Sequence, residues 1–170
     1  ASRFLLITTI LFAFTRPAVA GPGLHLGLNL SNTTTKPIIA GVFSATEFMF
    51  GIFNESELSG IFKLQLELNY LNKTVAKYLS VPILFKVKFD AGVLKPFIVG
   101  GPDVALKISG AGAKTFDFAG DIGGGVEFEA IPGLGIVLEG RYSHGFTNIS
   151  DLAGVEITTH GVHILGGVHL

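Results

Sequence analysis

Near the end of the chain, a serine and a histidine stand next to each other in a stretch that also carries an acid. Ser143, His144 and Glu139 are the residue types that act as nucleophile, base and orienting acid in hydrolases. Apolar and polar residues alternate here, and alternation along a strand places Ser143 and His144 on opposite faces. A nucleophile and its base must lie within hydrogen-bonding distance of each other, so this spacing argues against a catalytic pair. We therefore do not expect the protein to be an enzyme.

Two further patterns suggest a ligand but have the wrong spacing. The glycines at 123–125 lie inside an alternating run, whereas a phosphate-binding glycine loop needs a strand, a turn and the start of a helix. Three histidines near the end of the chain suggest a metal, but His163 and His169 are about 20 Å apart along one strand face. We therefore interpret His160, His163 and His169 as separate polar residues, and we predict no metal and no cofactor.

Charge and cysteine content narrow the choice of partners. The 170 residues include 12 basic and 13 acidic side chains, a formal charge of −1, with no basic cluster. This balance gives no support to nucleic acid as a partner. The chain has no cysteine, so neither a disulfide framework nor a thiolate site is expected.

The charged residues left to explain lie on the polar side of the alternating stretches. They carry both signs, as a closed interior requires for charge compensation, and we predict that they form one interior network: Glu67, Lys86, Glu127, Glu139 and Arg141. Arg141 is the only arginine after residue 20, and its planar fork can bind two carboxylates. Centring a turn on Pro132 and Gly133 places Arg141 near Gly124, with Glu127 as a diagonal neighbour. Lys86 is expected to reach the same acids from the far side.

The alternation that positions these residues is clearest from residue 116 to residue 146. One side of this stretch is purely apolar or glycine, and the other carries acids and Arg141. A period of two predicts two strands joined by a tight turn, because in a helix it would scatter polar and apolar residues around every side. Both strands exceed the roughly five to six residues usual for globular sheets. Long strands with one apolar face are typical of a membrane barrel.

The same pattern recurs along the chain and predicts eight strands, at about residues 24–32, 38–53, 62–70, 79–89, 95–109, 116–129, 136–143 and 162–170. The second strand should place Phe48 and Phe50 outside and Glu47 inside, and residues 54–60 should form a turn. Pro82 removes a ladder donor, so a bulge is expected there. The predicted fold is all-β: an eight-stranded antiparallel up-and-down transmembrane β-barrel.

A soluble barrel would turn its apolar face toward the interior, whereas a membrane barrel turns it toward lipid. Charges of both signs on the polar face, glycine on both faces and eight apolar faces nearly free of charge favour the membrane barrel. The mean hydropathy is +0.57, yet after residue 20 no apolar run approaches the roughly 20 residues of a membrane helix. The apolar residues are spread in alternation, as a barrel requires.

The amino-terminal segment differs from the rest. Arg3 precedes an apolar run from residue 4 to 14, and Ala18, Val19 and Ala20 form a cleavage site of the A-x-A type. We predict a signal peptide over residues 1–20, cleaved after Ala20, and a single β-barrel domain over residues 21–170. This assignment predicts export from the cytoplasm.

Five segments resemble the PorT-like outer-membrane β-barrel proteins, a branch near the OmpA and OmpX barrels; they are residues 24–32, 64–70, 78–86, 101–102 and 141–149. The resemblance implies a location in the outer membrane of a Gram-negative bacterium, reached by export through the periplasm. It also implies outer-membrane lipid and the barrel-insertion machinery as partners, and a monomer. Barrels that deacylate lipid A have the similar motif Arg-Tyr-x-His-x-Ser-Asn in this region. Here Phe146 stands at the position of that serine, two residues after His144.

The expected function is therefore that of an outer-membrane barrel whose lumen is filled by its own side chains. Eight strands leave an interior just wide enough for side chains to fill. Such a protein would have a structural, adhesive or envelope-accessory role. The alternative is a narrow channel or small-ligand carrier, and a lipid-modifying hydrolase is a weaker third hypothesis.

Overall fold

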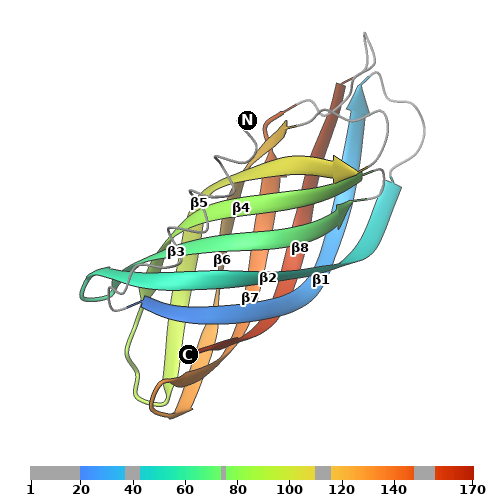
Figure 1. Ribbon diagram of the computed structural model, residues 1–170. Helices are drawn as coiled ribbons and strands as arrows, with labels where there is room; N and C mark the ends of the chain where they lie inside the picture. Colours follow the sequence, from blue (N-terminus) through green and yellow to red (C-terminus); the bar gives the residue numbers. More distant parts are fainter. Residues whose placement is uncertain (1–19, 37–42, 74–75, 110–115, 148–155) are drawn as a thin grey trace, which may run out of the picture.

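Eight strands close into an antiparallel barrel in chain order, with β8 hydrogen-bonded to β1 (Figure 1). The computed structural model describes residues 20–36, 43–73, 76–109, 116–147 and 156–170. The strands in these ranges are β1 (Ala20–Lys36), β2 (Phe43–Ser59), β3 (Phe62–Lys73), β4 (Ala76–Lys88), β5 (Leu94–Ser109), β6 (Phe116–Ile131), β7 (Leu134–Gly145) and β8 (Glu156–His169). The predicted up-and-down barrel is confirmed. Of the predicted signal peptide, residues 1–19 lie outside the described ranges.

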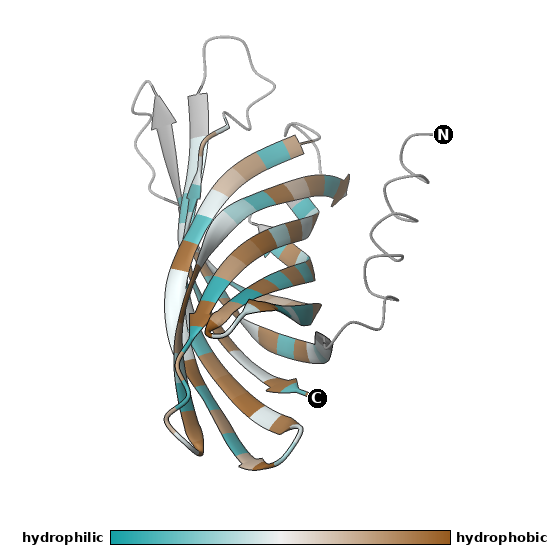
Figure 2. Cartoon of the chain, turned by 90° about the vertical axis from the view of Figure 1, so that its left-hand side faces the viewer, coloured by the Kyte–Doolittle hydropathy of each residue, from teal (hydrophilic) through white to brown (hydrophobic). Residues whose placement is uncertain are grey.

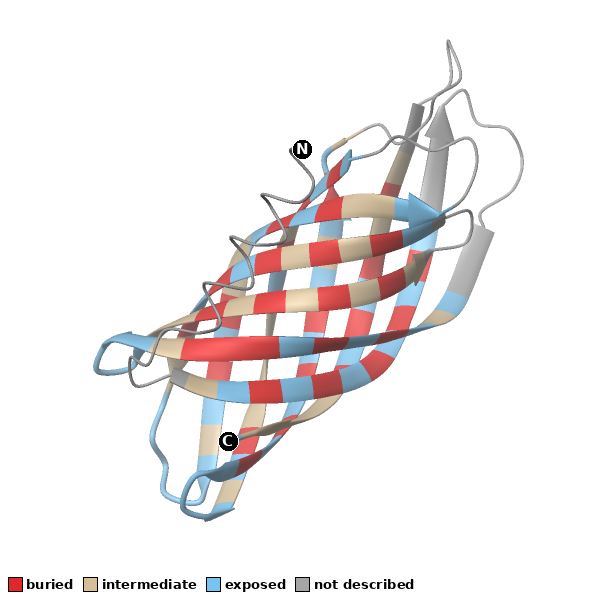
Figure 3. Cartoon of the chain, viewed as in Figure 1, coloured by how far each residue is buried: buried red, intermediate tan, exposed pale blue. Residues whose placement is uncertain are grey.

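Burial alternates residue by residue along the strands (Figure 3), and hydropathy alternates with it (Figure 2). The buried positions are mostly polar and the exposed ones mostly apolar. In β7, Ile136 and Leu138 are exposed while Glu139 and Arg141 are buried. A soluble barrel would show the reverse arrangement. The outward apolar surface is the one that a barrel presents to lipid. No helix in the described part of the chain is long and apolar enough to cross a membrane.

The two ends of the barrel differ in their connections. At one end, which we call the turn end, short turns join β2 to β3, β4 to β5 and β6 to β7. Gly60, Gly92 and Gly133 in these turns have positive φ angles of 53°, 80° and 80°, a conformation that glycine adopts without a steric cost. The other end, which we call the loop end, carries the longest connection, residues 146–155.

The second strand ends later than its sequence predicts, while its predicted start at residues 38–42 lies outside the described ranges. β2 continues to Ser59 and takes in most of the expected turn at residues 54–60, with Glu55 paired to Gln65 on β3. Polar residues inside a membrane barrel face the lumen, so a polar run is not by itself a turn signal. Further up the strand, Phe48 and Phe50 are exposed and Glu47 is half-buried, which is the expected arrangement.

The bulge expected at Pro82 is absent from the described pairing. β4 keeps one register with β3 along the whole pair, and one register with β5 from Tyr78 to Lys88. The irregularity in β4 lies instead between Lys77 and Tyr78. The fixed φ of proline is compatible with extended backbone, so Pro82 forfeits a ladder hydrogen bond without displacing the strand.

The pairing of β6 with β7 is shifted by one residue from the expected register. Arg141 lies opposite Gly123 and not Gly124, because a bulge between Phe128 and Ile131 shifts the ladder just above the turn. Directly opposite residues point to the same face of a sheet. Arg141 and Gly123 both face the lumen, whereas Gly124 is on the outer face, so the bulge is what allows the inner faces to match.

Candidate functional site

The five residues of the predicted interior network are all buried on the lumen side: Glu67, Lys86, Glu127, Glu139 and Arg141. Ion pairs divide these five residues into two groups, which are linked through Gln65: its side chain donates to Glu67 and accepts from Lys86. Arg141 pairs with Glu67 and Glu139, Lys86 pairs with Glu55, and Glu127 pairs with Lys88. The lumen therefore contains a cluster around Arg141 in mid-barrel and a second charged group at the turn end.

The mid-barrel cluster is centred on a fully buried guanidinium. Arg141 donates from Nη1 and Nη2 to the two carboxylate oxygens of Glu67, at 2.9 and 2.8 Å. Its Nε also donates to Glu139 at 2.8 Å, and Nη1 lies 3.5 Å from Asp121. Arg141 is on β7 and Glu67 is on β3, four strands away in an eight-stranded ring. The two side chains therefore meet across the lumen, and the paired geometry is the strong fork that arginine makes with a carboxylate.

Neighbouring side chains hold Glu67 in place for this contact. Gln65 and Asn69, two residues away on either side, donate to its two oxygens at 2.6 and 2.8 Å. Asn69 is in turn bonded to His25 on β1, with Oδ1 2.7 Å from Nε2. A buried ion pair offsets its desolvation only when its remaining polar atoms are also hydrogen-bonded. Glu67 meets this condition, so the cross-lumen contact is held from three strands.

Two of the predicted partnerships are wrong. Glu127 lies opposite Val137 and pairs with Lys88, so it is not the partner of Arg141. Lys86 bonds to Glu55 at 2.8 Å and to Gln65 at 2.9 Å, and its ammonium lies 4.0 Å from the ring centroid of Phe97. Alternation predicts which face a residue is on, but it does not predict its height in the barrel. Partners on opposite walls therefore cannot be found from it.

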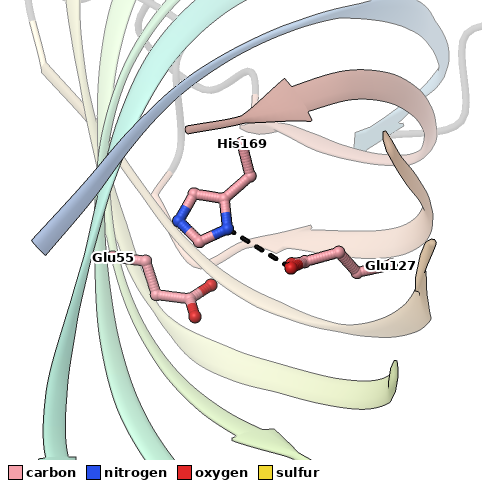
Figure 4. Close-up of side chains that lie close together, drawn as sticks. All are labelled: Glu55, Glu127 and His169. Atoms are coloured by element: carbon pink, nitrogen blue, oxygen red, sulfur yellow. Dashed lines mark hydrogen bonds and ion pairs between the residues drawn. The ribbon is translucent and has the colours of Figure 1, made fainter. Parts of the chain in front are cut away.

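A charged vestibule lies at the turn end of the lumen. We use this name for a cavity of about 270 Å³ lined by Gly21, Glu55, Glu57, Lys63, Lys88, Lys95, Glu127, Glu129, Gly133, Gly135, His169 and Leu170. The side chains of four glutamates and three lysines line it. The Lys88 ammonium bridges two of them, 2.5 Å from Glu55 and 2.8 Å from Glu127. His169 approaches the same group, with Nδ1 3.4 Å from Glu127 (Figure 4).

The sequence analysis leaves three members of this group out of the predicted network: Glu55, Lys88 and His169. Glu55 was assigned to a turn, so its side chain was not placed in the lumen. Continuing the parity of Met49 and Phe53, which are both buried, would have placed it there. His169 is predicted to share a strand face with His163 and is compared only with that residue. Its nearest acids come from β2 and β6.

The residues considered for hydrolysis lie apart. His144 is exposed on the outside of β7, with Nδ1 3.5 Å from the Tyr142 hydroxyl, and its ring packs edge-on against Phe146 at 5.3 Å. Ser143 is half-buried and lines the lumen at the loop end. Ser143 and His144 therefore face opposite sides of the barrel wall.

Comparison with protein families decides the class of this barrel. Residues 4–164 match the outer membrane protein β-barrel domain family. The chain belongs to this family. The family is broader than the PorT-like branch, so that finer resemblance stays a prediction. No match is found among curated proteins.

Solved structures with the same fold include three outer-membrane barrels. Neisserial surface protein A (NspA) has a TM-score of 0.64 at 14% identity, covering 89% of this chain and 97% of that one. The N-terminal β-barrel domain of Pseudomonas aeruginosa OprF scores 0.54 at 10% identity, covering 87% and 97%. The outer membrane enzyme PagL scores 0.54 at 15% identity, covering 83% and 97%. At these identities the similarity establishes the fold and nothing finer.

Proposed function

We propose that this outer-membrane protein is a non-conducting barrel with a structural, adhesive or envelope-accessory role. The observation that carries the proposal is the contact of Arg141 with Glu67 across the lumen, between two side chains that are fully buried. Eight strands leave little room beyond what side chains fill. A hydrated ion would have to break this fork to pass, and so would leave buried charges without partners.

The arrangement of the barrel supports a passive role in the membrane. Closure of β1 on β8 leaves no strand edge open for another chain to pair with, which supports a monomer in outer-membrane lipid. In bacterial barrels the short turns face the periplasm and the longer loops face outward. The turn end would then open its vestibule to the periplasm, and the loop end would face the cell exterior.

We propose further that the protein is not an enzyme. The support is the separation of Ser143 and His144 by the barrel wall, together with Phe146 packed against His144 on the outer surface. The alternative function, a narrow channel or small-ligand carrier, is favoured by one observation, the vestibule cavity of about 270 Å³. The two proposals differ in whether the lumen conducts beyond that cavity.

Conductance across planar lipid bilayers tests the proposal. We expect the wild-type protein to show no steady single-channel steps, and we expect Glu67→Ala combined with Arg141→Ala to raise ion leakage because both halves of the cross-lumen contact are removed. Lys95→Ala, at the rim of the vestibule, is the matched control and should leave the barrel closed. Large, regular steps from the wild-type protein would instead establish the channel.

A further inference from the structure

We propose that the vestibule contains a binding site for a divalent transition metal of the zinc class, formed by Glu55, Glu127 and His169. The inference concerns a site below the mid-barrel cluster and does not depend on whether the lumen conducts. Its three donors come from β2, β6 and β8, so only the closed barrel brings them together. Lys88 is the competing cation at this site.

The donor set has the chemistry and the spacing for such an ion. One ligand atom from each of the three residues lies within 4.8 Å of the others (Figure 4). Imidazole nitrogen and carboxylate oxygen are both zinc ligands, at about 2.0–2.2 Å from the metal, so small side-chain movements would bring all three into contact with one ion. Three protein ligands leave a fourth position for water.

The protein contacts of His169 are incomplete without an ion. Its Nδ1 faces Glu127 at 3.4 Å, outside the usual range of a good hydrogen bond. Its Nε2 is buried and has no hydrogen-bond partner within the described residues. Neither ring nitrogen is therefore fixed by a good hydrogen bond, so one of them is available as the ligand of an ion between the two carboxylates. Both carboxylates are almost fully buried, and the ring is 17% exposed toward the cavity.

Lys88 determines how tightly an ion can be held. Its ammonium lies between one oxygen of Glu55 and one of Glu127 and pairs with both, although it carries only one positive charge against their two negative ones. A divalent ion has to displace it from between these two oxygens into the adjoining cavity. Lys86 still holds the second oxygen of Glu55 at 2.8 Å. The site therefore exchanges one cation for another, and removing the lysine charge should tighten metal binding by roughly tenfold or more.

Titration with Co²⁺ tests the site, because four-coordinate Co²⁺ absorbs visible light much more strongly than the hydrated ion. The protein is untagged, folded in detergent micelles, and carries His160→Asn in every sample. This background removes a second place for an ion, since the rings of His144 and His160 lie 6.3 Å apart on the outer surface. The variants are His169→Ala, Glu127→Gln and Lys88→Met. Glu129→Gln is the matched control, a carboxylate of the same strand and cavity that pairs with Lys95.

The expected result is a saturable visible band that Zn²⁺ abolishes by competition. His169→Ala and Glu127→Gln should lose it, Glu129→Gln should keep it, and Lys88→Met should saturate at roughly tenfold lower Co²⁺ or less. Migration on gels before and after heating verifies that each variant is folded. A lost band could also come from misfolding, but the tighter Co²⁺ binding expected of Lys88→Met could not. A band that survives in both loss variants, or no band even in Lys88→Met, overturns the proposal.

Discussion

The mid-barrel cluster and the vestibule are made of the same kinds of residue and differ in how firmly their charges are held. In mid-barrel, Arg141 uses a rigid fork on Glu67, and Gln65 and Asn69 fix that carboxylate from both sides. In the vestibule, a single lysine ammonium bridges Glu55 and Glu127 at the wall of a cavity. The first arrangement suits a permanent closure, and the second leaves room for one cation to replace another.

The cation differs between the two regions, arginine in mid-barrel and lysine in the vestibule, and each suits its place. Arginine presents several donors in a plane and stays charged when buried, so it can satisfy two carboxylates at once with fixed geometry. The lysine ammonium is a compact charge on a flexible stem, and it can move without leaving a shaped gap. In this barrel the arginine is at the position with no exposure, while Lys88 is 9% exposed beside the cavity.

The largest contrast is expected from removing each cation. Arg141→Ala leaves Glu67 and Glu139 buried without their partner, which should lower the free energy of unfolding by about 3–5 kcal/mol. Lys88→Ala leaves carboxylates that Lys86 and cavity water can still reach, so the loss should be clearly smaller. Urea unfolding of both variants in detergent micelles measures the difference. Equal losses would mean that the two regions hold their charges equally firmly.

Coupling between pairs sharpens the same comparison. In a double-mutant cycle, Arg141→Ala and Glu67→Ala should show a coupling energy of about 0.5–3 kcal/mol, because the second substitution removes the charge that the first one strands. Arg141→Ala and Glu127→Ala should be additive to within about 0.5 kcal/mol, since Glu127 belongs to the vestibule. Unfolding midpoints and slopes of the four proteins in each cycle give these values. Coupling to Glu127 and not to Glu67 would contradict the observed register.

The sequence predicts the walls of this barrel better than its interior contacts. Alternation is a local property, so the inner and outer faces of β6 and β7 follow directly from it. The end of β2 was missed because a lumen-facing polar run resembles a turn. Gly60, with its positive φ, marks the turn, and the polar residues before it belong to the strand.

The partners of Arg141 and His169 cannot be predicted from alternation within a strand, for a different reason. Glu67 reaches Arg141 from the opposite wall, 74 residues away in sequence, and nothing within either strand encodes the height at which they meet. The bulge between Phe128 and Ile131 shifts the pairing of β6 and β7 by one residue. Counting pairs outward from the turn at Pro132 and Gly133 does not include this shift. The vestibule trio combines three strands, so its discovery requires closure of the barrel.

Two glycines on adjacent strands test how tightly the wall is packed beside the mid-barrel cluster. A Cβ at Gly123 would lie 2.8 Å from the Cα of Arg141 and closer still to the carbonyl oxygen of Gly140. Gly123→Ala should therefore cost about 1–3 kcal/mol, as overpacking does. Gly140→Ala is the matched control, because nothing lies within 4 Å of a Cβ at that outward position. Urea unfolding that shows Gly140→Ala to be the more harmful substitution would reverse the assignment of the faces.

The smallest effect is expected at the rim of the vestibule, where Lys95 pairs with Glu129. Each side chain is 24% exposed, and exposed ion pairs contribute about 0–1 kcal/mol. Lys95→Ala should lower stability by no more than this amount.

The effect of salt on stability should differ between the rim and the mid-barrel cluster. Raising the salt concentration from about 0.05 to 0.5 M should remove the small difference between wild type and Lys95→Ala, because screening weakens exposed pairs far more than buried ones. The deficit of Arg141→Ala should persist at both concentrations, since Arg141 and Glu67 have no exposed side-chain surface. Urea unfolding at the two concentrations measures both responses. A deficit in Arg141→Ala that vanished with salt would mean that ions and water reach the centre of the lumen, and the barrel would then be open along its length.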